Sequence, residues 1–229
     1  MGICEQDEID FMDYIQKEFV DLKTPVLLDV GANVGDYTQL FLQYMPKGNA
    51  ICYEPIPEIF DKLGIRFGAD PRVTCKNYGL YNKKIKNKKF YFVSNLKGSA
   101  SDDSGMSSLH YRPEHYPKFD YQEIKVNLIT MDSLIDTIDR VDVIKIDTEG
   151  SEYMVLEGGK NFIASKKPTF IQWEYGGCYI DSETKGKDVI SLLNELGYDV
   201  VDKTIRIITT DTFVENYTFQ NYMGILRDS

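Results

Sequence analysis

Apolar residues along the chain follow two patterns that alternate from beginning to end. Short continuous apolar runs are typical of strands covered on both faces of a parallel sheet. Stretches with apolar residues three or four positions apart predict amphipathic helices. The alternation predicts an α/β fold with a Rossmann-like, doubly wound, mostly parallel sheet and antiparallel closing strands. The predicted strands are 26–30, 50–53, 72–77, 89–93, 124–130, 141–147, 169–174, 198–201 and 222–226.

The helical stretches carry recognisable end signals. Pro25 ends the first of them, and Gly197 follows the last in the position that favours a left-handed residue. No internal repeat or linker is visible, so we expect one domain over 1–229, with residues 1–24 packed on it as a helix. The predicted helices are 12–22, 37–45, 57–67, one that carries Met154, Val155 and Phe162, and 189–196.

Composition changes between the predicted strands in the middle of the chain. Residues 94–108 hold mostly Ser, Gly, Asp and Asn, with few large apolar groups. Loops of that length in compact domains are usually functional. We therefore expect this stretch to form a lid over a ligand. The basic run 83–89 predicts a solvated hairpin or loop edge, and its alternative is a docking patch for an anionic substrate such as a nucleotide sugar.

Charge and cysteine spacing narrow the class of protein. The formal net charge is −10, and an acidic surface repels phosphate backbones, so we expect no nucleic-acid partner. The four cysteines are widely spaced, with no pair at metal-finger spacing, which favours a reduced, cytoplasmic setting. No apolar run approaches membrane-spanning length, and no secretory signal is visible, so we expect no membrane partner.

The stretch 26–38 carries the strongest candidate for ligand binding. An apolar strand runs into Asp29, then into Gly31 and Gly35, and then into a helical pattern. The glycines permit a tight turn and a close approach to a ligand at the carboxyl end of the strand. Glu54 closes the next strand, where an acid can accept hydrogen bonds from both hydroxyls of a ribose. Asp36 would repel a pyrophosphate, so a ribose ligand with an ammonium-bearing tail, such as S-adenosylmethionine, fits better than a dinucleotide.

Two further strands end in acids. Asp147 follows the strand 141–147, and Glu174 ends the strand 169–174. The carboxyl ends of these strands lie along one edge of a doubly wound sheet, together with Asp29 and Glu54. Four acids along one crevice are costly unless they bind cations or hydroxyls. We therefore expect Asp147 and Glu174 to face a second substrate, the acceptor.

Taken together, these motifs resemble the FkbM family of S-adenosylmethionine-dependent methyltransferases. The stretch 146–152, with its Asp-x-Glu-Gly-x-Glu pattern, and the Ser-Ser motif in 105–109 are its most specific parts. Thr148 stands where the family usually has a branched aliphatic residue, which is a mild departure. The resemblance implies a class I methyltransferase fold and transfer of a methyl group to a hydroxyl, often on a sugar or another small molecule.

The resemblance and the positions along the strands suggest a role for each cofactor-binding residue. Gly31, Asn33 and Gly35 are expected to cradle the methionine end, and Asp29 to orient that loop or hold the ammonium. Glu54 is expected to bind the ribose. Asn77 and either Ser107 or Ser108 are candidates to bind the adenine or the carboxylate, and further cofactor candidates are Tyr37, Thr38 and Asp147.

A sugar hydroxyl is a poor nucleophile at neutral pH, so the site needs a base or a cation. In one version Asp147 or His110 acts as the base. In the other, Asp147 and Glu174 bind Mg²⁺ or Mn²⁺, which grips the acceptor hydroxyl. Two alternative functions use the same nucleoside pocket: an NAD-dependent oxidoreductase, and a noncatalytic nucleoside-binding module.

Overall fold

The computed structural model describes residues 5–96, 104–112, 117 and 119–227. Its helices and strands alternate along most of the chain, as predicted. In chain order they are α1 (Gln6–Glu18), β1 (Val26–Val30), α2 (Asp36–Tyr44), β2 (Asn49–Tyr53), α3 (Pro57–Phe67), β3 (Val73–Lys76), β4 (Gly79–Leu80), β5 (Ile85–Leu96), η1 (Ser104–Met106), β6 (Phe119–Ile129), η2 (Met131–Leu134), β7 (Val143–Ile146), α4 (Glu152–Glu157), α5 (Lys160–Lys166), β8 (Phe170–Tyr175), α6 (Cys178–Ser182), α7 (Gly186–Glu195), β9 (Tyr198–Val201) and β10 (Gln220–Leu226).

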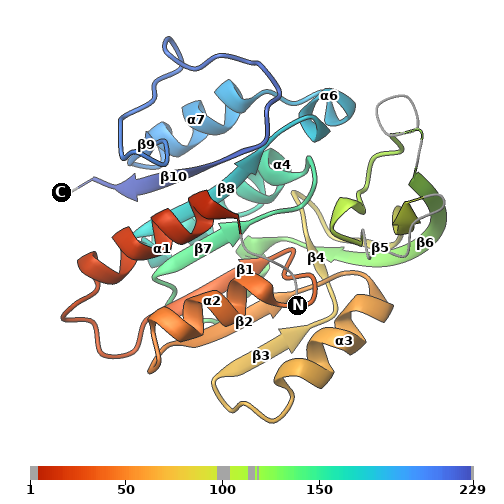
Figure 1. The fold of residues 1–229 in the computed structure, drawn as a ribbon, viewed down its shortest axis with the longest axis horizontal. Helices are drawn as coiled ribbons and strands as arrows, with labels where there is room; N and C mark the ends of the chain where they lie inside the picture. Colours follow the sequence, from red (N-terminus) through yellow and green to blue (C-terminus); the bar gives the residue numbers. More distant parts are fainter. Residues whose placement is uncertain (1–4, 97–103, 113–116, 118, 228–229) are drawn as a thin grey trace.

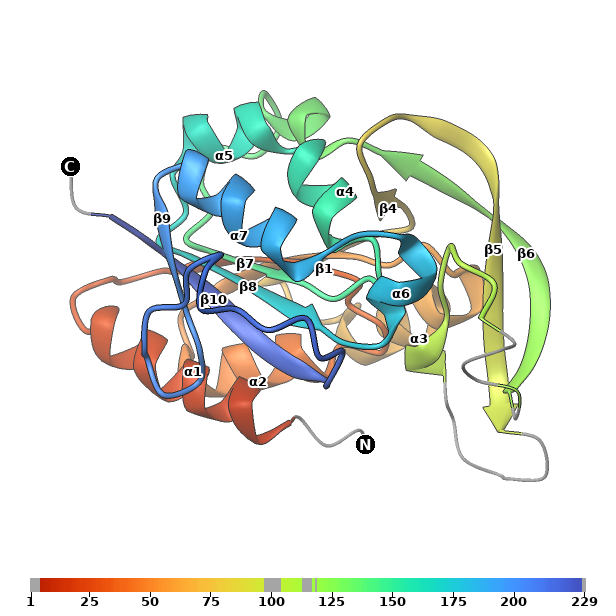
Figure 2. The same cartoon turned by 90° about the horizontal axis from the view of Figure 1, so that it is seen from above.

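A seven-stranded sheet runs through the centre of the molecule in the order β3-β2-β1-β7-β8-β10-β9 (Figure 1). The strands β3, β2, β1, β7 and β8 are parallel neighbours, whereas β10 runs antiparallel between β8 and β9. The helices α1, α2 and α3 cover one face, and α4, α5 and α7 cover the other (Figure 2). The doubly wound sheet with an antiparallel strand confirms the predicted fold class.

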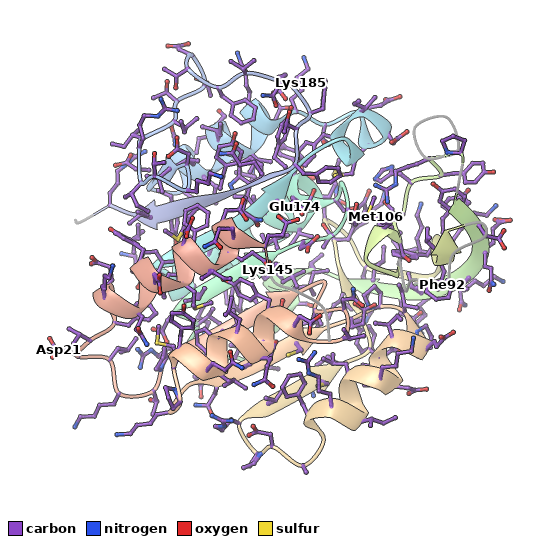
Figure 3. The ribbon with its side chains drawn as sticks, viewed as in Figure 1. Asp21, Phe92, Met106, Lys145, Glu174 and Lys185 are labelled. Atoms are coloured by element: carbon purple, nitrogen blue, oxygen red, sulfur yellow. The ribbon has the colours of Figure 1, made fainter. Side chains whose placement is uncertain are left out.

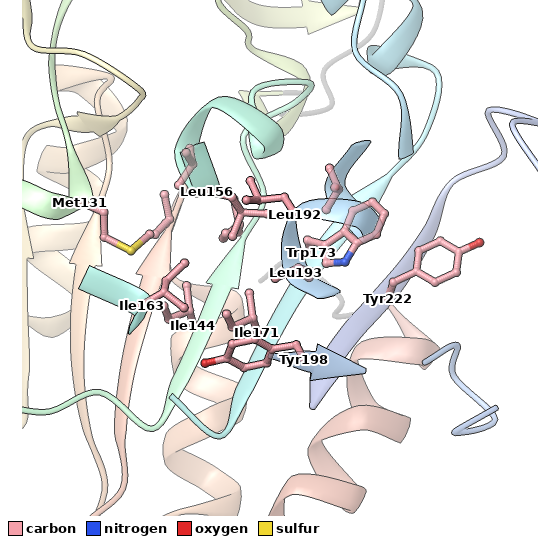
Figure 4. Packing of buried hydrophobic residues seen from close by; sticks show 14 of the residues in the cluster. Met131, Ile144, Leu156, Ile163, Ile171, Trp173, Leu192, Leu193, Tyr198 and Tyr222 are labelled. Atoms are coloured by element: carbon pink, nitrogen blue, oxygen red, sulfur yellow. The ribbon is translucent and has the colours of Figure 1, made fainter. Parts of the chain in front are cut away.

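The central strands are apolar because helices cover both of their faces. All four residues of β7 are buried, and so are all residues of β1 after the first. On the α4, α5 and α7 face, Ile144 and Ile171 of the sheet belong to one buried cluster with Leu156 and Leu193 of the helices (Figure 4). This packing fixes the carboxyl ends of β1, β7 and β8 side by side, where the polar residues follow.

A second, three-stranded sheet has the order β4-β6-β5 and lies beyond the carboxyl ends of the parallel strands (Figures 1 and 2). The long strands β5 and β6 are antiparallel. Phe90 and Phe92 on β5 pack in one cluster with Ile56 and Ile59 at the start of α3. The hairpin therefore forms a wall opposite the edge of the main sheet.

The prediction of one long helix after β7 was wrong. The single helix expected to carry Met154 and Phe162 is two helices, α4 and α5, which are separated at Gly158 and Gly159. A Cβ atom at Gly158 would lie 2.2 Å from the main-chain oxygen of Tyr81, so the chain breaks where the backbone must approach closely. The short elements β4 and α6 were not predicted.

The region between β3 and β7 also differs from expectation. The antiparallel strand predicted at 89–93 begins at Ile85, so most of the basic run is the largely exposed start of the outer strand of the β5–β6 hairpin, which agrees with a solvated hairpin edge. Much of the predicted lid, 97–103, lies outside the described residues. Within the described ranges, no helix is both long and apolar enough to cross a membrane.

Candidate active site

The turn after β1 depends on two glycines in left-handed conformations. Gly31 has a φ of 81°, and a Cβ atom there would lie 1.7 Å from the main-chain oxygen of Asp147. Gly35 has a φ of 87°, and its Cβ atom would lie 2.3 Å from the ring of Phe67. The turn thus runs directly against the end of β7, with no space for any side chain at either glycine.

Asp29 lies beneath this turn and not in an open cavity. Its side chain is fully buried, and Oδ2 accepts a hydrogen bond of 2.6 Å from Thr38 Oγ1 at the start of α2. Neither residue is among the described residues that line the two cavities described below. Asp29 therefore links β1 to the start of α2, the two elements that flank the glycine turn.

One cavity lies between the main sheet and the β5–β6 hairpin, and we call it the apolar cavity. Its apolar walls come from Ile56, Leu80, Phe90, Leu109 and Leu128. Its polar lining comes from Gly31, Asn33, Glu54, Gly105, Ser107, Asp147, Thr148, Glu149 and Ser151. A cavity with apolar walls and a few polar groups is typical of a small-molecule site.

Glu54 is fixed at the rim of this cavity by two main-chain donors. Its Oε2 accepts a hydrogen bond of 2.9 Å from the N–H of Asn33, and its Oε1 accepts one of 2.8 Å from the N–H of Ile56. Burial raises the pKa of Glu54 to about 7, although these hydrogen bonds lower it. The carboxylate is therefore pre-positioned at the end of β2, and the second lone pair of each oxygen can accept from a ligand hydroxyl.

The other predicted polar candidates have partners within the protein. Asn77 is not among the described lining residues, and its Nδ2 donates to the main-chain oxygens of Glu54 and Pro55 at 2.9 and 3.2 Å. Ser107 lines the cavity, but its Oγ accepts a hydrogen bond of 2.9 Å from the N–H of Val93. Ser108 Oγ donates to the main-chain oxygen of Glu149 at 2.7 Å. These contacts tie neighbouring segments together.

A second cavity, which we call the acidic cavity, opens on the other side of the glycine turn. It shares Gly31, Asn33 and Asp147 with the apolar cavity, so the two are contiguous. Its remaining lining residues are Glu5, Glu8, Ala32, Asp36, Tyr37, Lys145 and Glu174. Sequence reasoning missed the two acids from α1, because only the packing of α1 beside α2 and β10 brings them here.

Lys145 is the buried cation of the acidic cavity, close to Glu174 (Figure 3). Its Nζ lies 2.7 Å from Asp147 Oδ2, 3.9 Å from Glu8 Oε1 and 5.3 Å from the ring centre of Tyr37. Burial lowers the pKa of Lys145, but the carboxylates of Asp147, Glu8 and Asp29 raise it well above its ordinary value. Lys145 therefore stays charged and holds the side chain of Asp147.

Three carboxylates meet where the two cavities join. Oxygen atoms of Asp147, Glu149 and Glu174 all lie within 4.8 Å of one another. Burial raises the pKa of Glu174 well above its ordinary value, and the charges of Asp147 and Glu149 add to the effect. The structure thus brings together the predicted pair, Asp147 and Glu174, and adds Glu149 to it.

Glu149 is held in place by the segment 104–112. Arg112 is fully buried, and its Nη1 lies 3.0 Å from Glu149 Oε2, while its other terminal nitrogen donates to the main-chain oxygen of Met106. Burial raises the pKa of Glu149, and the charge of Arg112 lowers it. Glu149 itself has a φ of 54°, a strained conformation for a residue with a side chain. The segment and the loop after β7 are therefore fastened to each other across a buried ion pair.

His110 belongs to this segment but not to the described lining of either cavity. It is half-buried, and burial lowers its pKa to about 4, with a further decrease from Arg112. The structure therefore does not bring His110 together with Asp147 and Glu174.

The fold and the site define a class of protein. Three features are typical of a class I methyltransferase. They are a seven-stranded sheet with one antiparallel strand, a glycine turn after β1, and acids at the ends of β2, β7 and β8. The family model for the methyltransferase FkbM domain matches residues 29–200. The chain therefore belongs to the FkbM methyltransferase family. Helix α1 lies before the matched region.

Individual proteins show weaker similarity. The 2-O-methyltransferase NoeI of Sinorhizobium fredii is 26% identical over 157 residues, covering 66% of this chain and 63% of NoeI. The hexuronic acid methyltransferase AglP of Haloferax volcanii is 26% identical over 175 residues, covering 74% and 62% of the two chains. This chain thus spans less than two thirds of the length of both relatives.

Among solved structures, the fibrillarin pre-rRNA processing protein of Methanococcus jannaschii has a TM-score of 0.51 and 14% identity. That match covers 90% of this chain and 68% of fibrillarin. At this identity the likeness concerns the fold alone. Membership of a methyltransferase family argues against the NAD-dependent oxidoreductase considered above.

Proposed function

We propose that this protein transfers a methyl group from S-adenosylmethionine to a hydroxyl of a sugar or a sugar-bearing small molecule. The observation that carries the proposal is the junction of the apolar and acidic cavities at Gly31, Asn33 and Asp147. The family supports methyl transfer, and the two relatives named for 2-O-methylation and hexuronic acid methylation support a saccharide acceptor.

The residues present suit the cofactor. Gly31 lets the turn pack against the main-chain oxygen of Asp147, and the turn lines both cavities, so a ligand there can lie along the main chain. Glu54 is placed to accept hydrogen bonds from the ribose, and the apolar walls suit the base. The carboxylates of the acidic cavity suit the positive charges of the methionine end, beside Asn33 and Tyr37. When bound, S-adenosylmethionine supplies an electrophilic methyl group.

Asp147 is the residue that we assign to the reacting hydroxyl. It lines both cavities, and Lys145 fixes its Oδ2 at 2.7 Å. A carboxylate held in this way can orient the acceptor and receive the hydroxyl proton as the oxygen becomes nucleophilic. His110 is the weaker candidate, because it stands outside the described lining of both cavities.

A divalent cation is the other way to activate the hydroxyl at this place. Asp147, Glu149 and Glu174 offer oxygen ligands, which Mg²⁺ and Mn²⁺ prefer. Lys145 neutralises Asp147, and Arg112 neutralises Glu149. The third carboxyl group, Glu174, then needs either a proton or a bound cation. In this version Asp147 would be one of the ligands, and a bound cation would supply a lower pKa of the acceptor hydroxyl.

The proposed function is tested by incubating the protein with methyl-labelled S-adenosylmethionine and a panel of mono- and disaccharides, with and without EDTA. We expect label in at least one saccharide and none with the Asp147→Asn variant. If EDTA abolishes the activity and added Mg²⁺ or Mn²⁺ restores it, the version with a cation is correct. If EDTA leaves the activity unchanged, the version with Asp147 as the base is correct. Tight binding of S-adenosylhomocysteine without transfer to any member would instead favour the noncatalytic binding module.

A further inference from the structure

A serine at the base of the apolar cavity has no hydrogen-bond partner. Ser151 is only 2% exposed and lines the cavity, and its Oγ contacts no donor or acceptor within the described part of the chain. Buried hydroxyls in proteins are nearly always hydrogen-bonded, and an exception calls for an explanation. An unmet hydroxyl at the wall of a ligand cavity suggests that the ligand provides the partner.

Ser151 also lacks the hydrogen bond that is usual for a serine at its position in the chain. It is the residue immediately before α4, where a serine side chain normally accepts a hydrogen bond from the first turn of the helix. Ser151 makes no such bond. Glu152 satisfies the preceding turn in its place, because its Oε1 accepts hydrogen bonds from the N–H groups of Thr148 and Gly150 at 2.8 and 3.2 Å.

The other side-chain oxygens along the same wall already have partners. Thr148 Oγ1 lies 2.9 Å from Glu152 Oε1, and Glu149 pairs with Arg112. Ser107 Oγ accepts from the N–H of Val93. Among these side chains of the described lining, Ser151 is the one with no hydrogen bond within the protein, so its donor and both lone pairs of its oxygen are open to a ligand.

We infer that Ser151 Oγ hydrogen-bonds the polar edge of the purine base and so helps to select the nucleoside. The inference rests on the proposed function, which places the ribose at Glu54 and the base between the apolar walls. A purine presents an amino group and ring nitrogens around a flat apolar body, and a hydroxyl can donate to one or accept from the other. This role goes to Ser151 because Asn77 and Ser107, the residues expected from the sequence, are engaged elsewhere.

Calorimetric titration of the full chain with S-adenosylhomocysteine tests the inference. Ser151→Ala is expected to raise the Kd by about 5- to 10-fold, the usual effect of one hydrogen bond. Two S-adenosylhomocysteine analogues, one lacking the 6-amino group and one with carbon in place of N7, identify the atom. The wild type should bind one of these analogues about 5- to 10-fold more weakly than S-adenosylhomocysteine. Ser151→Ala should bind that analogue with the same Kd as the wild type does.

Ser191→Ala is the matched control, because Ser191 is exposed on α7. It should leave every Kd unchanged. A Kd for Ser151→Ala within twofold of the wild type would overturn the inference. An equal loss for all three ligands together with a lower thermal unfolding temperature would also overturn it, by showing a structural role. Failure of the wild type to bind S-adenosylhomocysteine at all is a distinct result that refutes the proposed function itself.

Discussion

The apolar and acidic cavities meet at the same three residues, yet they are built in opposite ways. Hydrophobic side chains form the walls of one, and carboxylates from four separate segments surround the other. An apolar cavity can hold a flat base with few directional contacts, whereas carboxylates hold cations and hydroxyls. The difference suits the two unlike ends of the proposed cofactor, with the residue proposed to act on the acceptor, Asp147, where the two cavities join.

Charge is also handled differently on the two sides. In the acidic cavity a single buried lysine, Lys145, lies near three carboxylates. On the apolar side Arg112 and Glu149 neutralise each other within a buried pair. A cationic ligand therefore gains more from the acidic cavity, and an uncharged base loses nothing in the apolar one.

Ligand binding is expected to change most where the two cavities share the main chain. Gly31→Ala places a Cβ atom 1.7 Å from the Asp147 oxygen at a φ of 81°, so the turn must move. We expect S-adenosylhomocysteine to bind about 100-fold more weakly or not at all, measured by calorimetry. Gly64→Ala is the control, because a Cβ atom there meets nothing within 4 Å and alanine favours the helix. Equal binding by Gly31→Ala and the wild type would contradict the shared junction.

Asp147→Asn separates binding from chemistry. The amide keeps the shape of the side chain but removes its charge and its ability to take a proton. We expect kcat to fall about 1000-fold while the Kd for S-adenosylhomocysteine changes only a few-fold. Asp199→Asn, which alters an exposed pair with Arg227, should change neither quantity. A parallel loss of binding and turnover would assign Asp147 to holding the cofactor and not to the chemical step.

Arg112→Met tests how the wall of the apolar cavity is fastened. Removing one member of a buried ion pair leaves Glu149 uncompensated, so the free energy of unfolding should decrease by about 3 to 5 kcal/mol. Arg227→Met breaks an exposed pair and should cost at most about 1 kcal/mol. Urea titration of both variants gives the comparison, and similar values for the two would show that the buried pair does not hold the wall.

Glu54 supplies the smallest effect, which depends on pH. Its pKa is about 7 in the folded protein and lower in the unfolded chain, so the folded state holds its proton more tightly. Stability should therefore decrease as pH rises from about 4.5 to about 7, with a contribution on the order of 1 to 3 kcal/mol. Urea titrations at a series of pH values should show a smaller slope for Glu54→Gln. An unchanged slope would mean that Glu54 titrates normally.

The sequence predicted those parts of the site that depend on local order. Gly31 and Gly35 mark their turn by type and spacing, and Glu54, Asp147 and Glu174 follow apolar strands whose ends must share one edge of a parallel sheet. The structure places these residues as that reasoning requires.

The remaining residues depend on contacts between distant segments. Glu5 and Glu8 reach the acidic cavity only because α1 packs beside α2 and β10, and Arg112 reaches Glu149 only through the β5–β6 hairpin. Lys145 did carry a signal, since residues two apart on a strand lie on the same face, and it stands two positions before Asp147. Ser151 carried none, because a serine before a helix ordinarily caps it.

The central claim is that the junction at Gly31, Asn33 and Asp147 holds a nucleoside with a charged amino-acid tail. Titration of the wild-type protein with S-adenosylhomocysteine, and separately with NAD, tests it most directly. The account predicts one molecule of S-adenosylhomocysteine bound per chain and no binding of NAD. Binding of NAD without S-adenosylhomocysteine would contradict it.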